Sequence, residues 1–138
     1  MNDLERVEKF IKEHHVMSLA SSDEDKLSVC SLFYSYDAKT KSFIVASSDD
    51  TLHIKHIKKN KNIAGNILLE TEEVGKIKGL QFRGEFLLLK DKKLQELYFT
   101  RFPYAKELEP KLWQIKANYF KLTDNALGFG KKIILSDF

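Results

Sequence analysis

The residues best suited to bind a charged ligand lie where one predicted strand ends and a helix begins. Ser47 and Ser48 close an apolar run, and Thr51 and His53 follow where helical spacing starts. Hydroxyl groups, free backbone N–H groups and the positive end of a helix dipole meet at such a junction, and together they can hold a phosphate. The alternative is that these residues only cap the helix and form turns. The two aspartates that follow Ser48 fit a phosphate site only if they point away from it.

A second polar set lies on a strand predicted over residues 77–89. Gln81 and two bases, Lys78 and Arg83, can present hydrogen-bonding groups to the edge of a ring. The alternative, on pattern alone, is a solvated strand face. Gly79 and Gly84 predict a bend or a bulge in this strand.

Histidine and cysteine show no comparable pattern. Adjacent residues such as His14 and His15 point to opposite faces of a strand, and His53 and His56 have no further ligands at matching spacing. We therefore predict no metal site. The only cysteine, Cys30, cannot form an intrachain disulfide, which fits a reducing cytoplasm and a role as a small buried hydrophobic residue.

These residues are positioned by elements that the hydrophobic periodicity predicts. Asn2 and Glu5 suit a capping box for a first helix that ends near Glu13. A short helix is predicted over 51–59, and another follows Asp91 and ends at Phe102-Pro103. About seven strands are predicted, over residues 16–22, 27–36, 42–48, 62–70, 77–89, 111–122 and 131–136.

The predicted strands favour an α+β fold, mainly β, built on a small antiparallel barrel. Most neighbouring strands are joined by short turns, which implies antiparallel pairing, and a closed or nearly closed barrel removes exposed edges. Residues 27–36 are apolar on both alternating faces, so we expect this strand to be buried on both sides.

Length and composition indicate one domain, residues 1–138, with enough apolar residues (43%) to bury a core. The net charge of +3 does not predict nucleic-acid binding, but it is compatible with an anionic small ligand. No apolar run approaches the length of a membrane span or resembles a signal peptide, so we expect a cytoplasmic protein that does not bind membranes.

The order of motifs resembles the pyridoxamine 5′-phosphate oxidase-like family of FMN-binding split barrels, and within it a bacterial, YhbP-like branch. One run of this sequence resembles the strand-helix-strand unit of that family: Phe43-x-x-x-Ser47-Ser48-x-x-Thr51-x-His53-x-x-x-Ile57-x-x-Asn60-x-x-Ile63-Ala64. The marks of the branch are His53, Gly79-Leu80-Gln81, Thr123-Asp124-Asn125 and Gly128-Phe129-Gly130. The resemblance covers roughly residues 5 to 135.

The resemblance implies a set of FMN contacts. Ser47, Ser48 and Thr51 would contact the phosphate or ribityl chain. His53 and Leu52 stand where the family usually has Lys and Arg, so permanent positive charge is missing, and His53 can compensate as a donor or as a cation. The remaining implied contacts lie along the flavin ring: Ser31, Leu32, Phe33, Tyr34, Lys78 and Gln81.

The function implied is that of an FMN-binding flavoprotein, an oxidoreductase acting on a small-molecule substrate that the sequence does not identify. One alternative is a flavin-binding or sensing module without turnover, and another is a split barrel adapted to haem or another cofactor. The resemblance also implies a homodimer with the cofactor at its interface. The outer apolar strand face, with Phe33 or Tyr34 among its candidates, would meet the partner.

Overall fold

Helices and strands follow one another in the predicted order, and the computed structural model describes all residues, 1–138. The α-helices are α1 (Asp3–Glu13), α2 (Leu52–Lys59) and α3 (Lys92–Arg101). The strands are β1 (Val16–Asp23), β2 (Lys26–Phe33), β3 (Ser35–Asp37), β4 (Ser42–Ala46), β5 (Asn62–Leu69), β6 (Lys78–Leu88), β7 (Leu112–Asp124) and β8 (Lys132–Ser136). The predicted number of strands is one too few, because residues 27–36 form two strands.

Two of the three helices begin with the predicted side-chain cap. The side chain of Asn2 accepts a hydrogen bond from the backbone N–H of Glu5 at 2.8 Å, and that of Asp91 accepts one from Lys93 at 2.8 Å. Each cap satisfies one of the free donors of the first turn. The longest helix, α1, has 11 residues, and no helix of the structure is long and apolar enough to cross a membrane.

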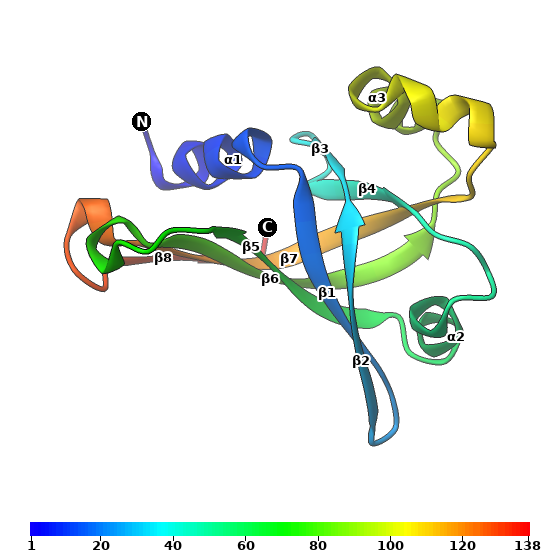
Figure 1. Cartoon of the computed structure of the whole chain (residues 1–138), viewed down its shortest axis with the longest axis horizontal. Coiled ribbons are helices and arrows are strands. Elements are labelled where there is room, and N and C mark those ends of the chain that lie inside the picture. The colour runs from blue at the N-terminus through cyan, green and yellow to red at the C-terminus, as the bar shows by residue number, and fades with distance from the viewer.

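A single antiparallel sheet contains all eight strands, in the order β2-β1-β5-β6-β7-β4-β3, with β8 paired to β7. The two edge strands, β2 and β3, are consecutive in the chain and are separated only by Tyr34. The sheet must therefore curl until its edges approach each other, which produces the incomplete barrel seen in Figure 1. The structure confirms the predicted class: an α+β, mainly β, antiparallel split barrel.

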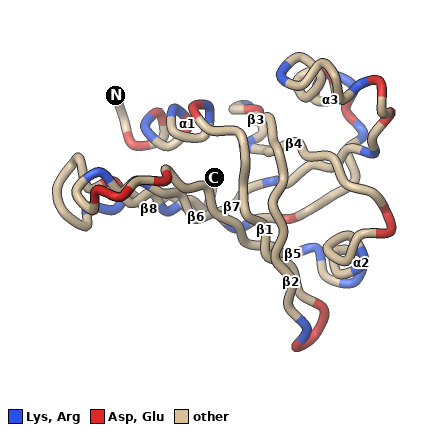
Figure 2. The backbone as a smooth tube through the Cα atoms, in the orientation of Figure 1, with Lys and Arg blue, Asp and Glu red and all other residues tan.

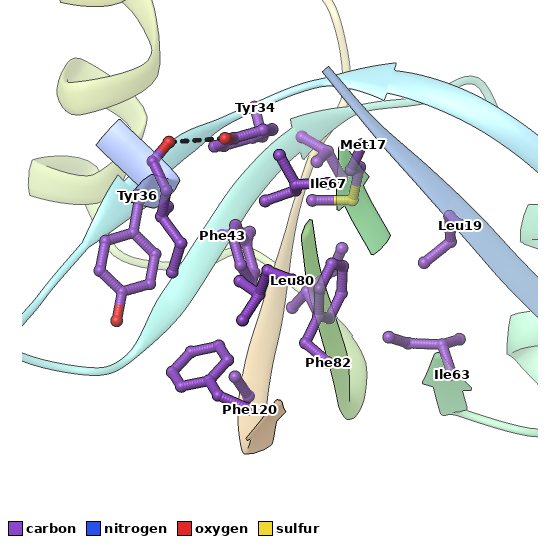
Figure 3. Packing of buried hydrophobic residues seen from close by; sticks show 14 of the residues in the cluster. Met17, Leu19, Tyr34, Tyr36, Phe43, Ile63, Ile67, Leu80, Phe82 and Phe120 are labelled. Atoms are coloured by element: carbon purple, nitrogen blue, oxygen red, sulfur yellow. Dashed lines mark hydrogen bonds between the residues drawn. The ribbon is translucent and has the colours of Figure 1, made fainter. Parts of the chain in front are cut away.

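Aromatic side chains fill the inside of the curled sheet (Figure 3). The ring centroid of Phe43 lies 4.6 Å from that of Phe82, 5.2 Å from that of Tyr36 and 5.3 Å from that of Tyr34. The hydroxyl of Tyr34 donates a hydrogen bond to the backbone carbonyl of Ile11 at 2.6 Å, which fixes the end of α1 to this cluster. We call this side of the sheet the inner face and the opposite side the outer face.

Strand β2 corrects the prediction that residues 27–36 are buried on both sides. Its outward side chains are exposed: Leu27 by 80%, Val29 by 73% and Phe33 by 58%. The inward ones, such as Cys30 and Leu32, are partly buried against the core. The physical reason is that β2 is an edge strand; of its outward side chains only Phe33 has an aromatic neighbour, Phe102, at 5.6 Å between ring centroids.

Helix α3 packs Leu94 and Tyr98 against the sheet, and one arginine of the helix adds hydrogen bonds to the chain on either side of β1 and β2. The guanidinium of Arg101 donates hydrogen bonds to the backbone carbonyls of Tyr34, Lys12 and His14. Arg101 therefore joins α3 to the end of α1 and to the junction between β2 and β3. All of these bonds are structural, and none faces a groove.

Candidate functional site

The loop between β4 and α2 gathers the residues predicted to hold a phosphate. The Ser47 hydroxyl lies 2.7 Å from Nε2 of His53, and the indole N–H of Trp113 donates to the Ser47 carbonyl at 2.9 Å. The Thr51 hydroxyl donates to the Ser48 carbonyl at 2.9 Å. We call Ser47, Ser48, Thr51 and His53 the α2 cluster, because they surround the amino end of that helix.

Two lysines lie against this loop and balance the charge of its first aspartate. Nζ of Lys111 is 3.0 Å from both carboxylate oxygens of Asp49, and Nζ of Lys58 is 3.1 Å from one of them. Hydrogen bonds from Lys111 and then Lys58 lower the pKa of the Asp49 carboxyl. Lys111, 62 positions away in sequence, thus brings permanent positive charge to the region where Leu52 and His53 provide none.

The two histidines of α2 both point toward the sheet but have different partners. Nδ1 of His56 lies 3.2 Å from the hydroxyl of Ser21 and 3.3 Å from that of Ser28, whereas His53 contacts Ser47. Burial, and secondly the neighbouring His56, lower the pKa of His53, so its ring is neutral at pH 7. No group of three or more His, Cys, Asp or Glu side chains is placed to hold a metal ion.

Residues 31–34, which the resemblance implies as ring contacts, point alternately to the two faces of the sheet. Ser31 and Phe33 are exposed on the outer face, whereas Leu32 packs against the core and Tyr34 is fully buried. Strand side chains alternate between faces, so consecutive residues cannot all contact one ligand. Only Ser31 and Phe33 are available to a ligand on the outer face.

The same alternation separates Lys78 from Gln81. Nζ of Lys78 lies 3.5 Å from a carboxylate oxygen of Asp124 and 5.6 Å from the ring centroid of Phe10, on the side of the sheet that α1 covers. Gln81 is three residues further along β6 and is exposed on the outer face. Lys78 therefore does not share a site with Gln81 in this chain, and the three-residue spacing already carried that information.

Gln81 and Ser31 instead belong to one polar row that crosses four strands. Ser31 on β2 pairs with Ser18 on β1, Ser18 pairs with Asn66 on β5, and Asn66 pairs with Gln81 on β6. Three strand spacings separate the ends of this row, a distance of roughly 14 Å. A flat polar ligand lying across the outer face would meet hydrogen-bonding groups along its whole length.

Two grooves, of about 470 Å³ and about 300 Å³, run over the outer face. They share Ala20, Ala64 and Arg83, so we treat them as one outer groove. Arg83 is the only charged residue that lines it, and Figure 2 shows the middle parts of β1, β2 and β5 free of charged residues. Half of the polar lining residues carry a carboxamide: Asn60, Asn62, Asn66, Gln81 and Asn118.

A bulge in β7 shapes one wall of the outer groove. Arg83 on β6 pairs with Tyr119, but the next residue, Gly84, pairs with Ala117, so Asn118 has no partner. As a result two consecutive side chains, those of Asn118 and Tyr119, line the groove beside Arg83. Bulges commonly re-aim side chains in this way next to binding sites.

The prediction of a bulge at Gly84 is confirmed, although the extra residue lies on the neighbouring strand. A Cβ atom at Gly84 would lie only 2.4 Å from the backbone carbonyl oxygen of Lys116, so glycine is needed for the two strands to approach. Gly79, by contrast, shows no register shift. Arg83 was predicted as the second base beside Gln81 on this strand, whereas no sequence pattern pointed to Asn118, Tyr119 or Lys111 as site residues.

Helix α2 lies between the two parts of the candidate site. Its amino end carries the α2 cluster, whereas Asn60, just past its last residue, lines the outer groove. A helix of eight residues spans roughly 12 Å, so the two parts are about that far apart. Neither groove includes a residue of the α2 cluster.

The curled antiparallel sheet places this protein among split barrels. A haem binding protein from Mycobacterium smegmatis superimposes with a TM-score of 0.82 at 12% identity, over 99% of this chain and 58% of that protein. An FAD-binding protein from Mesorhizobium loti gives 0.73 at 15% identity, over 88% and 92%. A Clostridium acetobutylicum protein of the pyridoxinephosphate oxidase family gives 0.71 at 14% identity, over 99% and 96%. At these identities the likeness shows the fold alone.

Sequence similarity identifies the family. A UPF0306 protein of Campylobacter jejuni is 38% identical over 130 residues, which is 94% of this chain and 95% of the relative. The UPF0306 protein YhbP of Escherichia fergusonii is 31% identical over 97% of this chain and 93% of its own length. The chain therefore belongs to the UPF0306 family. No family model matches the sequence.

Proposed function

We propose that this protein binds FMN and acts as a flavin-dependent oxidoreductase. The observation that carries the proposal is the outer groove, whose floor contains the small residues Ala20 and Ala64 and whose polar lining includes five carboxamides. A carboxamide offers a donor and an acceptor side by side, which matches the alternating N–H and C=O groups of the pyrimidine edge of a flavin. A floor of small side chains leaves room for a flat ring to lie against the sheet.

The α2 cluster supports binding of the FMN phosphate. A phosphate there would meet the free N–H groups at the start of α2, the exposed Ser48 and the Ser47–His53 pair. Lys111 and Lys58 add positive charge, because a phosphate can replace the Asp49 carboxylate as their partner. These contacts favour FMN over riboflavin, which lacks the phosphate.

The chain's own residues bind and orient in this proposal, while the flavin supplies the transfer of electrons or hydride. Among the residues that line the outer groove, only Arg83 and Tyr119 carry a titratable side chain. Gln81 and Asn66 hold hydrogen-bonding groups on the outer face without moving protons. This division suits a reaction in which the protein positions a substrate against the flavin.

We propose further that the working unit is a homodimer joined through the outer face. Leu27, Val29 and Phe33 leave large apolar side chains exposed on the outer face of β2, and Leu27 and Val29 also border the outer groove. A second copy would cover these side chains. Around a two-fold axis the α2 cluster of each chain could then complete the groove of its partner, because the two parts lie apart within one chain.

Haem is the competing cofactor, since a haem binding protein shares the fold. The residues that line the outer groove include no His, Cys or Met; the only haem ligand type among them is Tyr119, whose ring packs against Arg83. His53 and His56 are buried and bonded to serine hydroxyls. The groove therefore favours flavin. A stoichiometric, shifted Soret band after reconstitution with haemin would contradict this preference.

Titration of the purified protein with FMN and riboflavin, followed by quenching of flavin fluorescence, tests the cofactor. We expect FMN to bind at least tenfold more tightly, because a charge-assisted hydrogen bond contributes about 1.5–3 kcal/mol. Equal affinities would remove the phosphate site from the proposal. Reduction of the bound flavin by a nicotinamide donor, followed by reoxidation with a panel of acceptors, separates an oxidoreductase from a flavin-binding module without turnover.

The two histidines of α2 provide a matched pair for the phosphate contact. His53→Ala should weaken FMN binding about tenfold, since His53 belongs to the α2 cluster. His56→Ala should lower the free energy of unfolding instead, because it removes a buried ring and leaves the hydroxyls of Ser21 and Ser28 with only each other as partners. If His56→Ala is the more damaging change for FMN affinity, the phosphate lies elsewhere.

Light scattering over a dilution series tests the dimer. The wild-type chain should dissociate only at low concentration, and Val29→Asp should be monomeric at all concentrations, because it places a charge on the apolar edge of β2. Leu108→Asp, at another exposed apolar position, is the control and should remain dimeric. A wild-type monomer that still holds one FMN tightly would show that one chain completes the site.

A further inference from the structure

We propose that Arg83 and the bulge of β7 form a binding site for the anionic group of the substrate, a carboxylate or a phosphate monoester. The site lies in the wider part of the outer groove, where Asn62 and Asn118 line the groove with Arg83. This inference rests on the proposed flavin function in one respect, since it assumes that the anionic molecule is the substrate that reacts with the flavin. Binding of the anion itself is tested without flavin.

Charge in the outer groove is the first line of evidence. Charged residues make up 31% of the chain, yet Arg83 is the only one that lines the groove, and no carboxylate lines it. Arg83 takes part in none of the ion pairs of the structure; its neighbour on the same face, Glu85, pairs with Lys61 at 3.3 Å. The groove therefore presents one uncompensated positive charge to an entering ligand.

The orientation of Arg83 leaves its donors free. The guanidinium carbon lies 4.4 Å from the centroid of the Tyr119 ring, so the side chain packs over the aromatic face. Stacking engages the π surface of a guanidinium and leaves the N–H groups in its plane available for a two-point contact with a carboxylate or phosphate. No side-chain hydrogen bond of Arg83 is present to occupy them.

Arg101 shows what a structural arginine looks like in the same chain. Its guanidinium is occupied by the carbonyls of Tyr34, Lys12 and His14. Arg83 has an aromatic support but no acceptor. The contrast indicates that Arg83 is held in place for a partner that is not part of this chain's own fold.

The bulge supplies the neutral donors of the site. Asn118 reaches the groove only because β7 contains one extra residue opposite the pair Arg83 and Gly84. Its amide, with that of Asn62, can complete the hydrogen bonding of an oxyanion whose charge Arg83 balances. The narrower part of the groove, with Gln81 and Asn66, remains for the flavin ring, so the anion would hold the substrate next to it.

NMR titration of the full chain, purified without flavin, tests the site. The side-chain N–H signals of Arg83 and Asn118 are followed during addition of benzoate, phenyl phosphate or the neutral analogue benzamide. We expect saturable shifts with the anions, and Arg83→Gln should weaken anion binding about tenfold without changing the response to benzamide. Arg83→Lys, which keeps the charge but loses the planar fork, should fall between the two. Preference for benzoate or phenyl phosphate identifies the anion.

Lys26→Gln is the matched control, because it removes one positive charge next to the groove residue Leu27 from a side chain that neither lines the groove nor takes part in an ion pair. It should leave anion affinity unchanged. Equal anion affinity in Arg83→Gln and wild type would overturn the inference. So would a loss confined to FMN affinity, which would place the guanidinium against the flavin, or a loss confined to dimer affinity, which would place it against an acidic group of the partner chain. Failure of FMN to bind any variant would count against the proposed function alone.

Discussion

The two faces of the sheet differ in burial and polarity, although alternating residues of the same strands form them. On β6, Leu80 and Phe82 point to the inner face and are buried, whereas Gln81 and Arg83 between them are exposed on the outer face. Inner residues contact many neighbours and have no free hydrogen-bonding groups, while outer residues have groups without partners. Stability and ligand binding are therefore assigned to adjacent residues, and single substitutions can separate them.

The largest effect should come from the centre of the inner face. Phe43 is fully buried and packs against the rings of Phe82, Tyr34 and Tyr36. Phe43→Ala should lower the free energy of unfolding by about 3–5 kcal/mol, measured by urea denaturation, because it removes the ring and leaves a cavity. Phe129→Ala, at a position that is 84% exposed, is the control and should have no measurable effect. Similar losses in both variants would contradict the contrast.

A smaller effect is expected at the bulge. Gly84→Ala places a Cβ atom 2.4 Å from the backbone oxygen of Lys116, so β6 and β7 must move apart. We expect the free energy of unfolding, measured by thermal denaturation, to fall by about 1–3 kcal/mol. Gly75→Ala is the control, because a Cβ there meets nothing within 4 Å. Equal melting temperatures for the two variants would mean that the strands are not held this closely.

On the outer face, filling the groove should affect binding and not folding. Ala64→Leu adds bulk to the groove floor at an exposed position. We expect a change in the free energy of unfolding within about 0.5 kcal/mol and a loss of FMN affinity of about tenfold. Ala126→Leu, exposed in the short 3-10 helix η3 (Asn125–Leu127), controls for the added apolar surface. Unchanged FMN affinity would show that the ring does not lie on this floor.

The smallest effect concerns the pH dependence of stability and His53 of α2. The pKa of His53 is lowered in the folded protein, so as pH falls through about 6.5 the unfolded chain binds the proton first. The free energy of unfolding should therefore decrease between about pH 8 and about pH 5.5, and His53→Gln should reduce that decrease. His15→Gln, at an exposed position, is the control. A steeper decrease in His53→Gln would mean that the folded state favours the protonated ring.

Local signals in the sequence predicted most of the fold. Caps at Asn2 and Asp91, and the alternation of apolar residues, located the helices and strands to within a few residues. The exception, β2, looked buried because both of its faces are apolar. No local pattern distinguishes a central strand from an edge strand that leaves one apolar face exposed.

The candidate site was predicted less completely, for two physical reasons. The α2 cluster was found because its residues are neighbours in sequence, Gln81 was found as a polar residue beside bases on a strand, and Ser31 was found through the resemblance. Lys78 was joined to Gln81 by proximity along the chain, although alternation puts them on opposite faces. Lys111 reaches the cluster only through long-range pairing, which a single sequence does not reveal.

The extra residue in β7 has a consequence for anyone who designs or aligns such sequences. The side chains of β7 that point to the inner face are Trp113, Ile115 and Ala117, and then Phe120 and Leu122. The alternation between faces therefore shifts by one residue after Ala117. Deleting Asn118 would restore an unbroken alternation, and by pattern alone the shortened chain would look like a more regular strand. It would also remove the amide beside Arg83 and alter the wall that Tyr119 forms. A design procedure that rewards regularity would therefore choose the very change that erases the recognition surface.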